Sequence, residues 1–191
     1  MIGRLLPRLR RERGYSLIEM LIVLSIMGIV MGSLTTVFVT ASNAELDMNN
    51  RFQAQLTARL ALDKMRREVH CGSIATPAGS SSSVTLTLPS YCKTGSGSIT
   101  WCTRSVATNR YALYRVVGSS CTGGVKWADY LVPTSTAPVC SGALCIFTYT
   151  AQSTTSLAKL HVDFPVNVKP TKTVEQYELQ DDIVLRNSTR S

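Results

Sequence analysis

The first third of the chain contains a long apolar segment followed by an amphipathic one, with no proline between Pro7 and Pro77. Residues 20–39 carry no charge, and twenty residues form a helix of about 30 Å, long enough to cross a bilayer. Farther along, apolar residues recur every three or four positions, in the rows Met48, Phe52, Leu56, Leu60 and Ala58, Leu62, Met65, Val69. The pattern predicts a nearly continuous helix over about residues 15–74, with one broad apolar face in its second half.

The pattern changes to a period of two near residue 84. Residues 84–88 alternate between apolar and polar side chains, and no second long helix follows. Further strand candidates are residues 99–104, 111–117, 125–132, 144–149, 157–164 and 177–185. Consecutive short strands without intervening helices favour an antiparallel sheet. The predicted fold class is therefore α+β, with the helix covering one face of the sheet.

Charge and composition divide the chain further. Residues 1–14 contain five arginines and one glutamate, a net charge of +4 out of the total of +8. Basic residues beside an apolar span hold that side in the cytoplasm. We therefore expect a basic leader at 1–14, a membrane helix at 15–40, an amphipathic helix at 41–74 and an exported, β-rich domain at 75–191. The serine run of residues 80–83 is expected to be a loop.

Glu19 lies at the start of the apolar segment, where a charge is unusual. A carboxylate costs about 2.5–3.5 kcal/mol at the centre of a membrane helix and less near its end. Acidic groups inside membranes are rare and usually have a partner. The position of Glu19 therefore predicts a positively charged partner.

The leader, Gly14, Tyr15 and the following Ser-Leu-Ile-Glu-Met together resemble the signal of type IV prepilins and pseudopilins. This resemblance implies a pilin-like fold, cleavage between Gly14 and Tyr15 by prepilin peptidase, and methylation of the new N-terminus. It also implies that Glu19 pairs with the N-terminal amine of a neighbouring pilin or pseudopilin during filament assembly. An ordinary signal peptide would explain neither Glu19 nor the length of the apolar segment.

Two weaker features bear on assembly. Gly28 and Gly32 form a G-x-x-x-G motif, which allows close helix packing but is also common in membrane helices. The order of elements and the ending at residues 179–187 resemble minor pseudopilins of the J type and related minor pilins. The resemblance implies a protein that is anchored in membrane lipid and then incorporated into a pilus or pseudopilus.

All six cysteines follow the apolar segment, as expected for an exported domain with disulfides. They are Cys71, Cys92, Cys102, Cys121, Cys140 and Cys145. Six cysteines allow 15 connectivities. Proximity in the sequence favours the pairs Cys92–Cys102 and Cys140–Cys145, which leaves Cys71–Cys121. No C-x-x-C occurs, so we expect no metal site.

The sequence contains no catalytic or phosphate-binding motif, and we expect neither an enzyme nor a cofactor. His70 is expected to be structural at the helix end. Asp181 and Asp182 are adjacent in a predicted strand, so they should point to opposite faces.

Aromatic and basic residues alternate through the middle strands, a composition that also occurs in single-strand nucleic-acid sites. Tyr111 and Tyr114 are three residues apart in a predicted strand, however, so they should lie on opposite faces. Nucleic-acid binding is therefore not the expected function. The predicted function is a structural subunit, and the alternative is an exported binding module, either a tip adhesin or a DNA-uptake receptor, on the same type of anchor.

Overall fold

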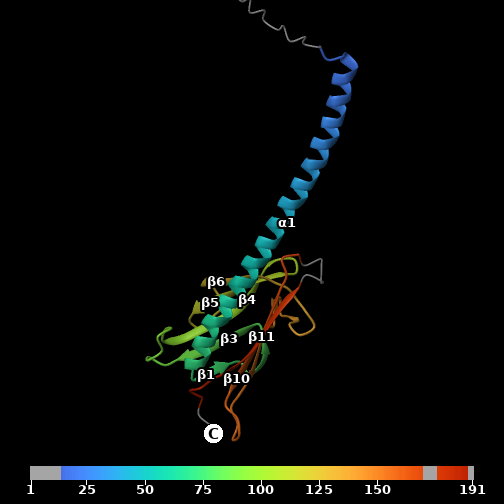
Figure 1. Ribbon diagram of the computed structural model, residues 1–191. Coiled ribbons are helices and arrows are strands. Elements are labelled where there is room, and N and C mark those ends of the chain that lie inside the picture. The colour runs from blue at the N-terminus through green and yellow to red at the C-terminus, as the bar shows by residue number, and fades with distance from the viewer. Residues whose placement is uncertain (1–13, 170–175, 189–191) are drawn as a thin grey trace, which may run out of the picture. The chain divides into compact units, whose positions relative to one another are not determined.

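The computed structural model describes residues 14–169 and 176–188, and the chain divides into two units, residues 1–47 and 48–191. A long helix, α1 (Leu17–Cys71), extends over both units (Figure 1). Its residues up to 47 belong to the first unit, and the remaining residues belong to the second. Its bounds agree with the predicted 15–74 to within three residues. The expected leader lies outside the described residues except for Gly14.

The second unit adds eleven strands to α1. They are β1 (Ile74–Thr76), β2 (Gly79–Ser81), β3 (Ser83–Leu88), β4 (Gly97–Ala107), β5 (Arg110–Val117), β6 (Val125–Leu131), β7 (Val139–Cys140), β8 (Ala143–Leu144), β9 (Phe147–Thr150), β10 (Lys159–Val166) and β11 (Tyr177–Val184). The serine run is not the expected loop, since β2 and the start of β3 lie in it. The candidate at 144–149 is divided between β8 and β9.

Nine strands form one sheet in the order β1-β3-β4-β5-β6-β10-β9-β2, with β11 on β10. All the pairings are antiparallel, as predicted. The pairing of β6 with β10 consists of the single register pair Leu131↔Val166. On one side of this junction, longer pairings connect β3, β4, β5 and β6 in that order. On the other side, β9 and β11 both pair with β10. The hairpin of β7 and β8 is a separate sheet.

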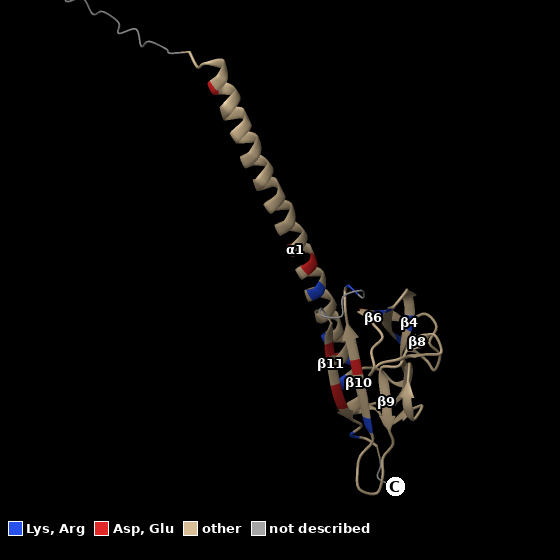
Figure 2. Cartoon of the chain, turned by 90° about the vertical axis from the view of Figure 1, so that its right-hand side faces the viewer, with Lys and Arg blue, Asp and Glu red and all other residues tan. Residues whose placement is uncertain are grey.

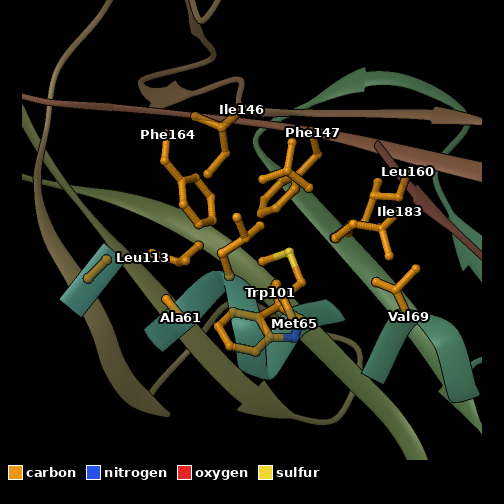
Figure 3. Packing of buried hydrophobic residues seen from close by; sticks show 14 of the residues in the cluster. Ala61, Met65, Val69, Trp101, Leu113, Ile146, Phe147, Leu160, Phe164 and Ile183 are labelled. Carbon is orange, nitrogen blue, oxygen red and sulfur yellow. The ribbon is translucent and has the colours of Figure 1, made fainter. Parts of the chain in front are cut away.

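The second half of α1 crosses the sheet and buries one side against it (Figure 1). The buried helix residues are Ala54, Ala58, Ala61, Leu62, Met65, Glu68 and Val69. In Figure 3, Ala61, Met65 and Val69 from the helix lie among Trp101, Leu113, Phe147, Phe164 and Ile183 from the strands. Burying these side chains is the main favourable term that holds the helix on the sheet.

One of the two predicted apolar rows is not part of this buried face. Met48, Phe52, Leu56 and Leu60 are 69, 59, 39 and 52% exposed. The expectation of one broad face containing both rows was therefore wrong. Alanines occupy the contact instead, and their small side chains let the helix backbone come close to the sheet. The larger residues of the row remain on the outside.

Three disulfides join the six cysteines: Cys71–Cys92, Cys102–Cys121 and Cys140–Cys145. The predicted pair Cys140–Cys145 is confirmed, and the predicted pairs Cys92–Cys102 and Cys71–Cys121 were wrong. Cys102 lies in β4, and its side chain is buried. The pairs follow proximity in the folded chain. The end of α1 lies beside the loop after β3, so Cys71 pairs with Cys92 of that loop.

The C-terminal end of α1 is fixed to the last strand and the segment after it. The Nδ1 atom of His70 donates to the carbonyl oxygen of Val184 at 2.9 Å. The Asn187 amide donates to the carbonyl of Cys71 at 2.7 Å, and so satisfies one of the carbonyls left open at the helix end. His70 therefore has the structural position expected from the sequence.

Candidate processing and assembly site

Residues 14–16 precede the helix in non-helical conformation, and Tyr15 is 79% exposed. The first hydrogen bond of the helix runs from the amide of Met20 to the carbonyl of Ser16 at 3.1 Å. Ser16 is therefore the residue from which α1 starts. The bond between Gly14 and Tyr15 lies directly before this start, in an exposed, non-helical piece of chain.

The carboxylate of Glu19 turns back toward the start of the helix. Its Oε2 atom accepts a hydrogen bond from the backbone amide of Ser16 at 3.4 Å. A serine at the helix start and a glutamate three residues later form the capping-box pattern. The sequence Ser-Leu-Ile-Glu already contains this signal, although a capping box was not predicted from it. Glu19 thus has a local structural role besides the one expected in assembly.

The apolar segment after Glu19 is exposed throughout, and its most apolar window contains no buried residue. Among residues 14–169 and 176–188, α1 is the one helix long and apolar enough to cross a membrane. Figure 2 shows one acidic position near its start and then a long uncharged stretch. This arrangement suits an environment of lipid or of other apolar helices.

Polar side chains inside this stretch satisfy their hydrogen bonds within the helix. The hydroxyls of Ser25, Ser33 and Thr36 donate to the carbonyls three residues earlier, each at 2.8 Å. Those of Thr35 and Thr40 donate to the carbonyls four residues earlier, also at 2.8 Å. A hydroxyl with an internal partner avoids most of the cost of leaving water. The segment is therefore compatible with a bilayer despite these polar side chains.

Gly28 and Gly32 lie one helical turn apart in the same stretch. A Cβ atom added at either position would meet no atom within 4 Å. The space beside both glycines is open, so a second helix could approach closely.

The aromatic and basic residues of the middle strands do not form an open platform on which a base could stack. Trp101 is fully buried. The guanidinium groups of Arg104 and Arg110 lie over the rings of Tyr114 and Tyr130, at 3.5 and 3.9 Å from the centroids. A base would have to displace these arginines in order to stack on either ring. The geometry does not favour stacking of bases on this group of residues.

The sheet unit also has a groove of about 260 Å³ between α1 and β6. Asn50, Gln53 and Thr57 line it on the helix side, and Trp127 and Asp129 on the strand side. The Asp129 carboxylate is held by Arg110 at 2.9 Å and by Lys126 at 2.9 Å. Burial acts to raise the pKa of Asp129, but the hydrogen bonds from Arg110, Lys126 and the amide of Tyr130 lower it to about 2. Among the described residues that line the groove, Asp129 is the only carboxylate, and it is engaged in ion pairs.

Asp181 and Asp182 point to opposite faces, as predicted. Asp181 accepts hydrogen bonds from Arg66 of α1 at 2.9 and 3.0 Å. Asp182 pairs on the other face with Lys159 at 3.1 Å and with Nδ1 of His161 at 2.8 Å. In the described part of the chain, no three His, Cys, Asp or Glu side chains gather where they could hold a metal ion.

Residues 9–35 match a family model described as the prokaryotic N-terminal methylation motif. The chain therefore carries a type IV prepilin-like signal, and its helix is long and apolar enough to cross a membrane, which supports a membrane-anchored, pilin-like protein. No curated protein and no solved structure matches the chain significantly.

Proposed function

We propose that this protein is a minor pilin or pseudopilin, a structural subunit of a type IV pilus, a type II secretion pseudopilus or a related filament. The observation that carries the proposal is the methylation motif at residues 9–35 on a helix whose apolar half is exposed. A surface of this kind in a single chain needs lipid before assembly and other helices after it.

The proposal assigns a sequence of steps to the N-terminal segment. Prepilin peptidase cuts between Gly14 and Tyr15 on the cytoplasmic side, and the new Tyr15 amine is methylated. The β-rich unit lies on the other side of the membrane, and its three disulfides are typical of an oxidising compartment. Filament assembly then transfers the apolar helix from lipid to contacts with neighbouring helices.

In this proposal Glu19 exchanges its partner during assembly. Before assembly its carboxylate caps the helix by accepting from the Ser16 amide. In the filament it pairs with the terminal amine of a neighbouring subunit. Two unit charges 4 Å apart attract by about 4 kcal/mol at an effective dielectric constant of 20, which is enough to offset the burial of the carboxylate near the helix end.

Two further surfaces of α1 support helix packing. Gly28 and Gly32 leave room for a close neighbour in the apolar half. The row Met48, Phe52, Leu56 and Leu60 is a second exposed apolar surface, in the second half of the helix. We infer that neighbouring pilins or pseudopilins cover this row in the filament.

The test compares two substitutions at Glu19 by photo-crosslinking from an exposed helix position, Ile29, in membranes of the host. Glu19→Gln retains the capping hydrogen bond and the side-chain volume but loses the charge, whereas Glu19→Ala loses all three. Both variants should insert and be cleaved, and both should give few crosslinks to other pilins. Leu17→Ile serves as the control and should assemble like the wild type.

If Glu19→Gln assembles as well as the wild type, the capping box explains Glu19 and its proposed role in assembly is wrong. Full assembly of Glu19→Ala as well would favour the alternative, an exported binding module that uses the signal for anchoring alone.

A further inference from the structure

Asp163 is a buried carboxylate without a hydrogen-bond partner. It lies in the middle of β10 and is only 2% exposed, and neither of its oxygens forms a hydrogen bond. Burying an ionised carboxylate without compensation costs several kcal/mol. Buried polar groups in folded proteins almost always have partners, so an exception of this kind indicates a missing one.

Other oxygen-bearing side chains surround Asp163. In the β10–β11 pairing, Asp163 is opposite Gln180, and Pro165 is opposite Glu178. Because alternate residues of a strand share a face, Glu178 and Gln180 project on the same side of the sheet as Asp163. Thr136, in the segment between β6 and β7, extends to the same place, and its hydroxyl donates to Glu178 Oε1 at 2.8 Å.

The electrostatics of the cluster are unfavourable for an ionised Asp163. Burial raises the pKa of its carboxyl, the Thr136 hydroxyl lowers it, the Glu178 carboxylate raises it and Gln180 lowers it, with a net upward shift. Asp182, on the same face two residues beyond Gln180, shows the contrasting case. Lys159 and His161 hydrogen-bond to it and lower its pKa. Among residues 14–169 and 176–188, no Lys, Arg or His ion pair is found for Asp163 or Glu178, in contrast to Asp182.

We propose that Asp163, Glu178, Gln180 and Thr136 form a binding site for a hard divalent cation, with Ca²⁺ as the ion. Two carboxylates, an amide carbonyl and a hydroxyl supply oxygen ligands alone, which Ca²⁺ prefers, and water completes its six to eight ligands. The two carboxylates balance the charge of the ion. This site is independent of the proposed role in a filament.

Binding would join three parts of the second unit. Thr136 belongs to the segment after β6, Asp163 to β10, and Glu178 and Gln180 to β11. An ion held by all three would attach that segment to the sheet, as the Cys140–Cys145 disulfide closes the next hairpin. Extracellular calcium modules typically bind with dissociation constants of about 10⁻⁴–10⁻³ M, so millimolar calcium would occupy the site.

The test is calcium-dependent thermal unfolding of the full chain in detergent micelles, after treatment with a chelator, at neutral pH. At calcium concentrations about ten to a hundred times the dissociation constant, Tm should rise by about 3 to 10 °C. NaCl of equal ionic strength provides the reference. Isothermal titration should give one calcium ion per chain.

Asp163→Asn should abolish the calcium-dependent rise, and without calcium it should be no less stable than the wild type, because it removes an unpaired charge. Asp182→Asn, on the same face but outside the cluster, should retain the rise. Should Asp163→Asn fail to fold, Glu178→Gln carries the same test, since Glu178 is exposed. The proposal is overturned if the wild type shows no rise or if the variants in the cluster show the same rise.

A third measurement separates the ion from a proton. If calcium has no effect, but acidification alone raises the Tm of the wild type and not that of Asp163→Asn, then Asp163 and Glu178 share a proton. That result would overturn the proposed cation site in favour of a shared proton.

Discussion

The carboxylate of Glu68, on the buried side of α1, accepts a hydrogen bond from the indole nitrogen of Trp101 at 2.8 Å. Both side chains are fully buried. The second carboxylate oxygen accepts from Arg115 at 2.8 Å and pairs with Lys64 at 3.3 Å. A single acidic residue thus connects the helix to β4 and β5. Its charge is tolerated because hydrogen bonds reach both oxygens and two cations balance it.

We predict that Glu68→Ala destabilises the protein by about 3–5 kcal/mol, because the buried Trp101 N–H and the partly buried Arg115 lose their acceptor. Glu68→Gln should cost less, since its amide oxygen can still accept from one of the two donors. Urea unfolding in detergent, followed by tryptophan fluorescence, measures both.

Asp63→Ala on the same helix is the control. Asp63 forms an exposed pair with Arg66, and its loss should change stability by no more than about 0.5 kcal/mol. Equal effects of Glu68→Ala and Asp63→Ala would contradict the structural role of Glu68.

Processing after Gly14 gives a second prediction. The mature N-terminus should be Tyr15 with one added methyl group, and mass spectrometry of the membrane-extracted protein checks it. Gly14→Leu should leave a full-length precursor in the membrane, because a large side chain replaces the small residue before the cut. A mature chain that starts beyond residue 40 would instead indicate an ordinary signal peptidase.

The disulfides give a third prediction. Peptide mapping without reduction should find Cys71 linked to Cys92, Cys102 to Cys121 and Cys140 to Cys145. A peptide that links Cys92 to Cys102 would contradict the structure.

Removal of single disulfides should follow the length of the loop that each closes. Replacing Cys102 and Cys121 by alanine opens a loop with a sequence separation of 19, against 5 for Cys140 and Cys145. By loop entropy alone the costs are about 3 and about 2 kcal/mol. A larger loss from the short loop would mean that loop entropy does not dominate.

Asp129 gives a prediction about pH. Its pKa of about 2 lies below the ordinary value of 3.8, so its ion pairs stabilise the folded state fully above about pH 4. As the pH falls toward 2, the carboxylate is protonated and this contribution is lost. Asp129→Asn should therefore cost about 1–2 kcal/mol at pH 5, with allowance for partial exposure, and little at pH 2. Urea unfolding at several pH values tests this. A cost that does not change with pH would show that the charge of Asp129 contributes nothing.

The sequence by itself determined the features that depend on neighbouring residues. An uninterrupted apolar stretch predicted the membrane helix, and alternation predicted most strands of the sheet, because both patterns follow from the local geometry of the backbone. The N-terminal signal was recognisable for the same reason, since Gly14, Tyr15 and Glu19 lie within six residues.

Only the tertiary structure decided which face of α1 is buried. Met48 and Phe52 are more hydrophobic than Ala54 and Ala58, yet they are exposed and the alanines are buried. Close contact between a helix and a sheet favours small side chains, and no periodicity in the helix alone shows which apolar row meets the sheet. Glu68 was not predicted either, because its partners Trp101 and Arg115 are 33 and 47 residues away. The disulfide pairs likewise depend on which distant cysteines the folded strands bring together.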